Sequence, residues 1–335
     1  MGGVPHGAVF DRLDPVDARL LDEFQRDLPL IPRPFAAMAS DLSLDEAEVI
    51  ARLVRLQAAG TVARVGGTVR PNTAGASTLA ALAVPGDRIE TVAALVNAEP
   101  GVNHSYLRED DWNLWFVATA PDVAGLAASL ARIGARTGLK VLDLPLVRAF
   151  NIDLGFRMAG PRAALGVDQG VDRAALREDD RPLLQAMARG LPLVQRPFAA
   201  LGDRLARAEA EVIARLTALV QARILTRVGV IVRHRAIGWA ANAMVVWDVS
   251  AGGIEPAGRA LAALPGVTLC YQRRLVPGVW RHGLFSMIHG QTRAQALEVL
   301  ASARALPELA DADHRALFST RCFKQTGALL DPEAA

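Results

Sequence analysis

The sequence predicts an α+β protein built as two tandem copies of one module, and three observations lead to this prediction. Residues 28–56 and 191–219 align without a gap and are identical at 18 of 29 positions. Further along, PGVNHSYLR (100–108) matches PGVTLCYQR (265–273). Within each copy, helix signals come first, and a mixed order of strand and helix signals follows. A period this long indicates a duplicated module and not a solenoid of short repeats.

Composition and charge restrict the class of protein. The 335 residues suffice for two or three domains, and 51% hydrophobic with 21% charged residues indicates a folded globular chain. Lys and Arg number 37 against 35 Asp and Glu, so the net charge of +2 gives no signature of tight nucleic-acid binding. The two cysteines, Cys270 and Cys322, are too few for a disulfide framework and lack zinc-site spacing.

Neither a membrane span nor a secretion signal is expected. The sequence has no apolar run of ~18 or more residues, and its start lacks the charged-then-apolar pattern of a signal peptide. We therefore expect a cytoplasmic protein that does not enter a membrane.

Each module is expected to begin with short helices. In the first copy, Asp14 and Pro15 provide an N-cap and a first helical residue for an amphipathic helix that extends to about Asp27. A second, shorter helix begins near Pro34, because proline favours the first turn of a helix.

A third helix and a hairpin are expected next. Ser43 and Glu46 have the spacing of a capping box at the start of a helix over 44–59. The following TVARVGGTVR is interpreted as two short strands joined by a turn at Gly66 and Gly67. Three helices and a β-hairpin make a winged helix-turn-helix.

The segment RPFAA occurs in both copies. Its proline begins a helix, and Phe35 and Phe198 are expected to pack in the core. A structural role is the simpler interpretation, although a ligand role for Arg33 or Arg196 stays open.

The rest of each module has the βαββαβ order of a ferredoxin-like domain. In the first copy the expected elements are strand 77–84, helix 88–98, strand 101–108, strand 112–119, helix 122–136 and strand 139–150. The second copy repeats this order from about 242 to 325.

These elements give the expected domain organisation. The boundaries are a first module at 1–156 (winged helix about 14–71, ferredoxin-like about 77–152), a linker at 157–180, and a second module at 181–335 (winged helix about 181–234, ferredoxin-like about 242–327). The two ferredoxin-like halves are expected to pair through their sheets as an intramolecular pseudo-dimer. A further homodimer stays open.

A winged helix suggests DNA binding, but the charges argue against it. The helix that would read base edges begins with carboxylates, namely Asp45, Glu46 and Glu48 in the first copy and Glu209 and Glu211 in the second. Phosphates repel these groups, whereas base readout needs Arg, Lys, Asn or Gln. We expect Glu48 with Arg52, and Glu211 with Arg215, to form i,i+4 surface pairs instead.

Candidate binding residues concentrate on the strands of the ferredoxin-like halves. Because side chains alternate along a strand, His104, Tyr106 and Arg108 share one face, and so do Tyr271 and Arg273. The neighbouring candidates are Arg274, Trp280, His282 and His289. Each of these residues could instead have a purely structural role. A histidine on a half-buried strand can form its hydrogen bonds within the protein, and a tryptophan can cover the sheet. If they converge, arginines, histidines and aromatic rings suit a flat, polyanionic, aromatic ligand, and a neutral histidine can ligate iron.

These motifs resemble a known enzyme family. The two-part architecture resembles Lrp/AsnC transcription regulators. The segments PGVNHSYLREDDWNLWFV (100–117), CYQRRLVPGVWRHGLFSMIHG (270–290) and FSTRCFKQTG (318–327) are similar to signature segments of siroheme decarboxylase. The resemblance extends from about 14 to 328 and is to the fused, two-module form.

The resemblance implies a reaction and a substrate. Two acetate carboxyl groups of siroheme are removed, giving didecarboxysiroheme on the way to heme or to the heme of a nitrite reductase. No dissociable cofactor is implied, because the iron enters with siroheme. Two positions depart from the pattern: Gly283 stands where an asparagine is expected, and Leu269 stands where the first copy has His104.

The resemblance also implies residue roles. His289 is the first candidate for proton donor or iron contact, and Tyr271 and His282 come next. Substrate carboxylates are assigned to Arg273 and Arg274. The remaining substrate-binding candidates are Trp280, His104, Tyr106 and Arg108, with His104 or His289 as the candidate ligand of the substrate iron. The alternatives are an Lrp/AsnC-type regulator, which would sense heme, and a chaperone that holds the tetrapyrrole unchanged.

Overall fold

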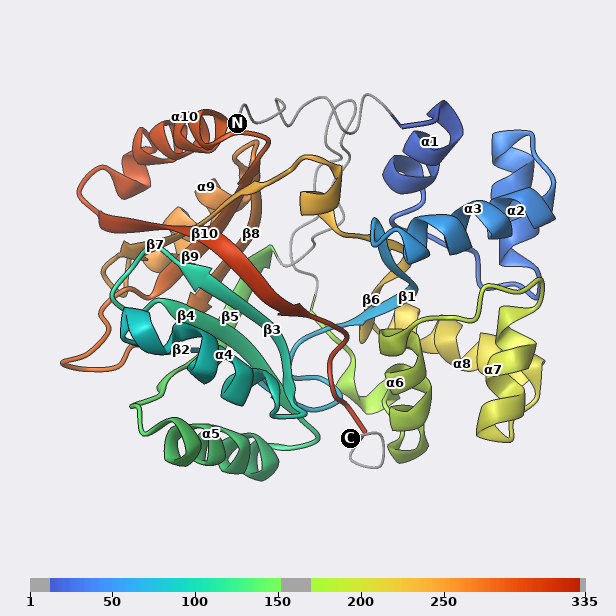
Figure 1. Ribbon diagram of the computed structural model, residues 1–335, viewed down its shortest axis with the longest axis horizontal. Coiled ribbons are helices and arrows are strands. Elements are labelled where there is room, and N and C mark those ends of the chain that lie inside the picture. The colour runs from blue at the N-terminus through green and yellow to red at the C-terminus, as the bar shows by residue number, and fades with distance from the viewer. Residues whose placement is uncertain (1–12, 152–169, 332–335) are drawn as a thin grey trace.

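The computed structural model describes residues 13–151 and 170–331. Figure 1 shows two parts side by side: a helical part that contains the start of both modules, and a β-barrel with helices outside it. Each part therefore combines segments from both copies of the repeat.

The helical part contains two helix-turn-helix units that share one hydrophobic core. Its helices are α1 (Pro15–Glu23), α2 (Pro34–Leu42) and α3 (Glu46–Ala58) from the first copy, and α6 (Arg181–Arg189), α7 (Pro197–Leu205) and α8 (Glu209–Gln221) from the second. Phe35 and Phe198 are both completely buried in this core, as predicted. Asp14 caps α1 through its side chain, also as predicted.

The predicted capping box is wrong. Ser43 has a left-handed backbone (φ 56°) and ends α2, and Asp45 is the residue before α3. Glu46 instead accepts a hydrogen bond from Arg33 Nε at 3.1 Å. The second copy repeats this ion pair between Arg196 and Glu209, so in both copies the arginine of RPFAA fixes the helix-turn-helix.

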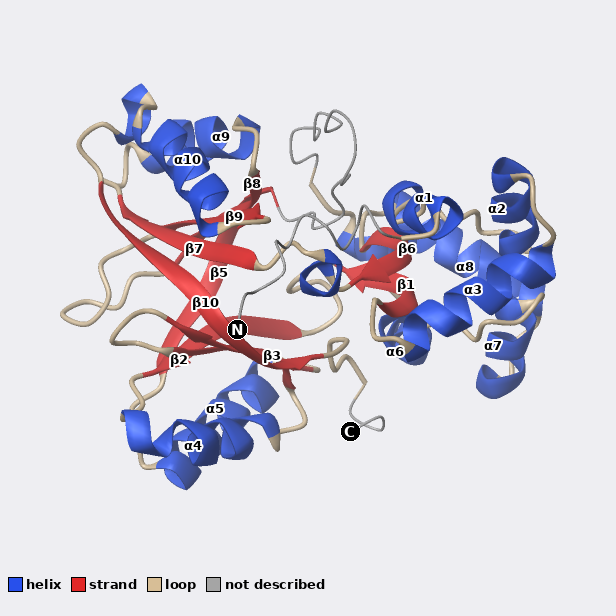
Figure 2. Cartoon of the chain, turned by 45° about the horizontal axis from the view of Figure 1, so that its top comes forward, coloured by secondary structure: helices blue, strands red, loops and turns tan. Residues whose placement is uncertain are grey.

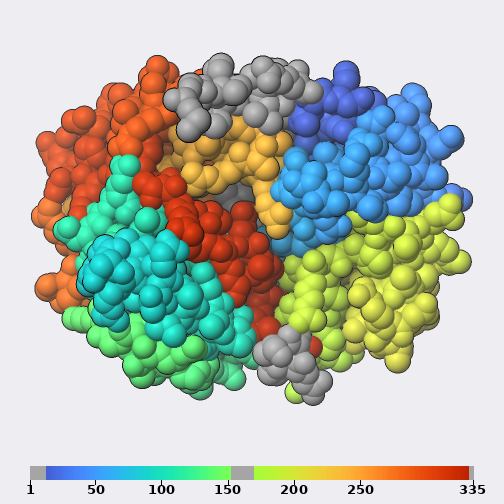
Figure 3. Space-filling model, viewed as in Figure 1, coloured from blue at the N-terminus to red at the C-terminus, as the bar shows by residue number. Residues whose placement is uncertain are grey.

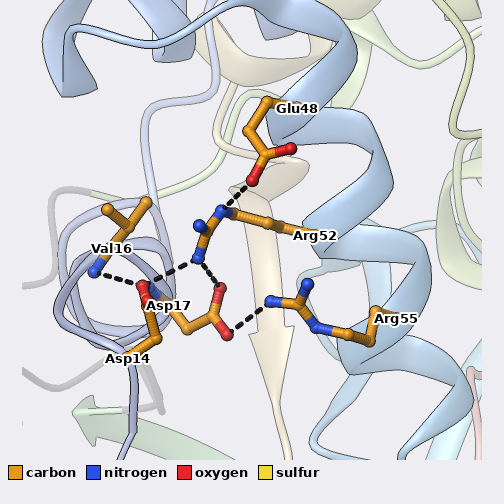
Figure 4. A network of polar contacts seen from close by, with 6 residues as sticks. All are labelled: Asp14, Val16, Asp17, Glu48, Arg52 and Arg55. Atoms are coloured by element: carbon orange, nitrogen blue, oxygen red, sulfur yellow. Dashed lines mark hydrogen bonds and ion pairs between the residues drawn. The ribbon is translucent and has the colours of Figure 1, made fainter.

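Figure 4 shows how α1 is fixed to α3. Arg52 contacts Asp14 Oδ1 at 2.7 Å, Asp17 Oδ1 at 2.9 Å and Glu48 Oε1 at 2.7 Å, and Arg55 contacts the other oxygen of Asp17 at 2.7 Å. The predicted pair of Glu48 with Arg52 is thus present, inside a larger network.

The corresponding pair in the second copy is wrong. Arg215 binds the buried carboxylate of Asp180, with Nε 2.6 Å from Oδ1. Glu211 lies 3.9 Å from Arg207 instead. Asp180 lies just before α6, so Arg215 fixes α8 to α6 as Arg52 fixes α3 to α1.

The predicted hairpin at Gly66 and Gly67 is also wrong. Each copy contributes one continuous strand, β1 (Val62–Val69) or β6 (Leu225–Val232), and these two strands pair antiparallel with Gly66 opposite Gly229. A Cβ on Gly66 would lie 2.5 Å from the Met187 carbonyl oxygen. Glycine is therefore required for close approach of the end of α6, and not for a turn.

The barrel has eight strands in the order β10-β3-β4-β2-β5-β8-β9-β7 and is closed. The strands are β2 (Ala76–Leu82), β3 (Val102–Arg108), β4 (Leu114–Ala120), β5 (Leu142–Asn151), β7 (Ala241–Asp248), β8 (Val267–Arg273), β9 (Leu284–Gly290) and β10 (Asp313–Gln325). With its helices, each half has the predicted βαββαβ order. The last strand of each half continues onto the other half, so that β5 pairs with β8 and β10 with β3.

Helices cover the outside of the barrel, as Figure 2 shows. They are α4 (Ile89–Asn97) and α5 (Val123–Thr137) on the first half, and α9 (Ile254–Ala263) and α10 (Arg293–Arg304) on the second. Short 3₁₀ helices occur at Gly86–Arg88 (η3), Arg173–Ala175 (η4), Glu178–Asp180 (η5), His234–Ile237 (η6) and Pro307–Leu309 (η7). Nowhere in residues 13–151 and 170–331 is a helix both long and apolar enough to span a membrane.

The inside of the barrel is a core shared by the two halves. Its buried members include Leu79, Trp115 and Leu144 from the first half and Met244, Phe285 and Leu317 from the second. This core also contains the candidate residues Tyr271 and Trp280.

Candidate functional site

His104, His289 and the η6 segment lie at the end of the barrel that faces β1 and β6, and the Tyr-Arg pairs lie deeper along β3 and β8. We call this end the barrel mouth; its walls are the inner faces of β3, β7, β8, β9 and β10, and its rim includes the η6 segment. Figure 3 shows a hollow at this place, bordered by red residues of the C-terminal strand and orange residues of the segment that follows β6.

His289 lies near the end of β9 at the mouth, and two polar neighbours orient its ring. Its Nδ1 is 2.7 Å from Thr268 Oγ1, and its Nε2 is 3.0 Å from Asn242 Nδ2. Because the Thr268 hydroxyl donates to the Met287 carbonyl, it accepts from Nδ1–H, which leaves Nε2 to accept from the amide of Asn242. The ring of His234 lies 6.4 Å from that of His289.

His104 lies on β3 and has one ring nitrogen bound within the protein. Nδ1 is 2.6 Å from Asn103 Oδ1, so it carries the proton and Nε2 carries the lone pair. Burial, assisted by the charge of Arg64, lowers the pKa of His104 to about 4. At neutral pH this imidazole is uncharged, with Nε2 open to a ligand.

Two Tyr-Arg pairs occupy equivalent positions in the two halves. Arg108 lies over the Tyr106 ring at 5.4 Å, and Arg273 lies over the Tyr271 ring at 4.6 Å. Each guanidinium donates to a carbonyl of the opposite half, Arg108 to Leu317 at 3.0 Å and Arg273 to Leu144 at 2.6 Å. The pKa of Arg108 also responds to Tyr271, which belongs to the opposite half.

Neither guanidinium has a carboxylate partner among the described residues. The Nε atoms of Arg108 and Arg273 are buried without a hydrogen-bond partner in this part of the chain. Burial lowers the pKa of Arg108 to about 10 and also lowers the pKa of Arg273. Buried cations without a counter-charge are costly, and a bound anion would remove that cost.

The second copy contributes mouth residues that the sequence analysis did not single out. Arg235 donates to Ser319 Oγ at 3.3 Å and is close enough to affect the pKa of Tyr106. Desolvation, together with His289, lowers the pKa of the half-buried His234 to about 3. In the sequence, only the position of His234 and Arg235 could have indicated this role, because they directly follow Arg233, which the repeat aligns with Arg70.

Three predicted residues do not converge with the others. His282 precedes β9, whereas His289 lies near its end, so the two histidines are at opposite ends of this strand. Trp280 is buried between Trp115, at 5.4 Å, and Phe285, at 6.3 Å, and helps to close the far end of the barrel.

Arg274 follows β8 and points outward. Its side chain is 65% exposed, and its Nη2 lies 3.9 Å from Asp143 Oδ2. The predicted carboxylate clamp of two adjacent arginines is therefore wrong, because alternation along the strand puts only Arg273 inside the barrel.

The mouth suits a flat anion with several carboxylates. Histidines on β3 and β9 and two Tyr-Arg pairs on β3 and β8 line the interior. Among the residues of known placement, no group of three or more His, Cys, Asp or Glu is arranged to hold a metal ion.

Family models match both copies of both parts. A model for a "Siroheme decarboxylase NirDL-like HTH domain" matches residues 17–62 and 180–225. A model for an "AsnC-like ligand binding domain" matches residues 74–151 and 236–324. The fold class predicted from the sequence is confirmed.

Relatives match the whole chain. The siroheme decarboxylase NirDL subunit of Paracoccus denitrificans (strain Pd 1222) is 67% identical over 96% of this chain and 99% of its own length. The NirD subunit of Stutzerimonas stutzeri is 52% identical over 44% of this chain and 98% of its own length. The crystal structure of a siroheme decarboxylase NirDL in complex with an iron-uroporphyrin III analogue aligns at 28% identity and a TM-score of 0.67, over 95% of this chain and 94% of that one. The chain belongs to the siroheme decarboxylase family, in its fused NirDL form.

Proposed function

We propose that the barrel mouth is where this siroheme decarboxylase binds siroheme and removes two acetate carboxyl groups. The observation that carries the proposal is a pair of guanidiniums, Arg108 and Arg273, whose Nε atoms are buried and which have no ion pair with a carboxylate among the described residues. Side-chain carboxylates of siroheme would supply the missing negative charge through charge-assisted hydrogen bonds. Tyr106 and Tyr271 would then lie against the macrocycle.

The reaction needs a proton but no oxidant. The acetate carboxylate leaves as CO₂, its bonding electron pair stays on the methylene carbon, and one proton converts that carbon to a methyl group. The neighbouring pyrrole ring delocalises the developing charge. The protein must therefore hold the remaining carboxylates, exclude water and supply one proton for each CO₂.

We assign the proton to His289. Thr268 and Asn242 fix the orientation of its ring, and Asn242 Oδ1 is buried without a hydrogen-bond partner among the described residues. If the amide of Asn242 turns over, this oxygen accepts from Nε2–H of a protonated His289. The same neighbour thus accommodates the ring before and after proton transfer, which typically contributes ~10²–10⁴-fold to a rate.

We assign the contact with the substrate iron to His104. Its Nε2 carries the lone pair, has no partner among the described residues, and belongs to a ring whose pKa is lowered to about 4. A neutral imidazole nitrogen of this kind is a common iron ligand. Both ring nitrogens of His289 are already bound within the protein, which favours His104 for this role.

We further propose that the chain needs no dissociable cofactor, acts in the cytoplasm and does not bind DNA. The cations of the first recognition helix support the last point, because Arg52 and Arg55 are bound by carboxylates of α1 and α3. Strand pairing between the halves supports a complete site within one chain, and a further homodimer would add no residue to it. An electrophoretic shift of promoter DNA that weakens with salt would contradict the proposal that the chain does not bind DNA, and it would favour the regulator alternative.

The proposal is tested by anaerobic incubation of the purified protein with siroheme, followed by mass spectrometry of the extracted tetrapyrrole. Loss of two CO₂ per molecule is expected. His289→Ala should bind siroheme but lose most turnover. His314→Gln is the matched control, because His314 stacks on Trp247 at 5.1 Å, away from the mouth. Siroheme that stays bound and unchanged would favour the chaperone alternative, and full activity of His289→Ala would refute its assigned role.

A further inference from the structure

Arg235 extends from the rim of the barrel mouth to the depth of Arg108. On the β9 side of η6, the ring of His234 lies 6.4 Å from that of His289. On the β10 side, Arg235 donates from Nη1 to Ser319 Oγ at 3.3 Å and from Nη2 to the Ser319 carbonyl at 3.4 Å. Ser319 lies directly opposite Arg108 in the pairing of β10 with β3. Hydrogen bonds and strand register thus place the guanidinium of Arg235 next to the position of Arg108.

Ser319 faces the inside of the barrel. Side chains alternate along β10, and Leu317, two residues earlier, is buried in the core that the two halves share. Arg108 donates to the Leu317 carbonyl at 3.0 Å, so both guanidiniums bind the same stretch of β10. We call Arg108, Ser319 and Arg235 the β3–β10 seam.

Neither cation of the β3–β10 seam is neutralised by the described part of the chain. The hydrogen bonds of Arg235 go to neutral oxygens, and the Nε of Arg108 is buried without a partner among the described residues. Burial, and in smaller part the charge of Arg235, lowers the pKa of Arg108 to about 10, which agrees with the proximity of the two groups. A carboxylate has two oxygens and could accept from both guanidiniums at once.

The equivalent seam between β5 and β8 has one cation and an apolar neighbour. Arg273 donates to the Leu144 carbonyl at 2.6 Å, as Arg108 does to a carbonyl of β10, so the two seams correspond. The residue opposite Arg273 is Leu146, in the position that Ser319 has at the other seam. A leucine side chain cannot hold a second guanidinium by a hydrogen bond.

The counterpart of Arg235 in the first copy has a structural role. The repeat aligns Arg235 with Asn72. The Oδ1 of Asn72 accepts from the Ser77 backbone N–H at 2.7 Å and from the Ser77 hydroxyl at 3.0 Å, which fixes the start of β2. The second cation and the hydroxyl that holds it are therefore features of the β3–β10 seam and not of its counterpart.

We propose that Arg235 is a specificity-determining residue that binds a side-chain carboxylate of the tetrapyrrole together with Arg108 at the β3–β10 seam. The proposal rests on the function proposed above. One carboxylate oxygen would accept from the orphaned Nε of Arg108 and the other from Arg235, which Ser319 keeps in place. Because the β5–β8 seam has a single cation, the ligand is held more strongly at one edge, and this sets its orientation relative to His289.

The test compares the binding of iron-uroporphyrin III by wild type, R235Q, R235K and R321Q, followed by the Soret absorption and with the Tm measured for each. R235Q should bind about 10-fold more weakly with an unchanged Tm, since a charge-assisted hydrogen bond to the ligand is lost. R235K should recover part of the affinity. Because Arg235 is exposed, the difference between wild type and R235Q should shrink as the salt concentration rises.

R321Q is the matched control. Arg321 also belongs to β10, but its guanidinium binds Glu90 of α4, outside the barrel. Its replacement removes one positive charge two residues from Ser319 without changing the mouth. R321Q should therefore keep the affinity of the wild type.

A second ligand identifies the carboxylate. Iron coproporphyrin has propionates but no acetates, so an equal loss for both ligands in R235Q assigns a propionate, and a loss for iron-uroporphyrin III alone assigns an acetate. Unchanged affinity of R235Q for both ligands, or an equal loss in R321Q, overturns the proposal. If wild type binds neither ligand and does not decarboxylate siroheme, the function proposed above is what fails.

Discussion

Replacing Arg108 with methionine should stabilise the protein without substrate and abolish substrate binding. Burial lowers the pKa of Arg108 from its ordinary value to about 10. Because the pKa of this cation is depressed on folding, its charge opposes folding at every pH below about 10 and ceases to do so only above it. At neutral pH the cost is therefore fully present.

The magnitude follows from the shift and from the contacts that are lost. A depression of ~2.5 units at 1.36 kcal/mol per unit corresponds to a cost of ~3 kcal/mol. Methionine fills a similar volume, but the hydrogen bond to Leu317 (~1 kcal/mol) and the contact over Tyr106 (~0.5–1 kcal/mol) disappear. A net gain of ~1–2 kcal/mol should raise the Tm by a few degrees.

Differential scanning calorimetry with and without iron-uroporphyrin III measures both effects. Without ligand, the wild type should have a lower Tm than Arg108→Met. The ligand should raise the Tm of the wild type strongly and should leave the Tm of Arg108→Met unchanged. Arg136→Met, on the exposed face of α5, removes one charge elsewhere and should change neither quantity. A substrate-free Tm that falls by several degrees in Arg108→Met would refute the reasoning, because the cation would then stabilise the fold.

Three further predictions follow from the geometry. Burial lowers the pKa of His104 to about 4, so between pH ~6.5 and 4 the unfolded chain binds more protons than the folded one, and the free energy of unfolding should fall as the pH falls through this window. In urea unfolding, His104→Gln should reduce the loss of stability between pH 7 and 5 by ~1–2 kcal/mol. The same pH dependence in the variant and the wild type would contradict this. Residues 1–160 and 165–335, produced together as separate chains, should associate and decarboxylate siroheme, while either alone should not, as size-exclusion chromatography with activity assays can show. Titration of iron-uroporphyrin III should saturate at one ligand per chain, since both halves build a single mouth, and two equal sites would contradict it.

Local signals in the sequence predicted most elements but not how they pair. The repeat and the helix signals specified the helices to within a few residues, and alternation correctly placed His104, Tyr106 and Arg108 on one face. The prediction of a turn at Gly66 and Gly67 is wrong, because a glycine that admits a neighbouring backbone and a glycine in a tight turn have the same sequence signature. Only the approach of α6, far away in the sequence, distinguishes them.

The site was harder to predict for a related reason. Residues close in sequence are grouped in the sequence analysis, which therefore expects His282 beside His289. The two histidines instead lie at opposite ends of β9 and are separated by the length of this strand. Conversely, the η6 segment reaches the mouth from the helical part, and no periodicity within this segment indicates that. Contacts made across a closed barrel depend on strand order, which composition and spacing do not encode.

The fusion of two modules lets equivalent positions take different roles. Arg108 and Arg273 are kept in both halves and lie near the shared interior, where a symmetric pair can serve one ligand. At the mouth the halves differ: the repeat aligns His104 with Leu269, and His289 with Thr119. Each histidine is thus present once, on a different strand of its own half. A symmetric pair of identical modules would place both kinds of histidine in each half. One asymmetric mouth instead holds a single substrate between two histidines that need not share the same task.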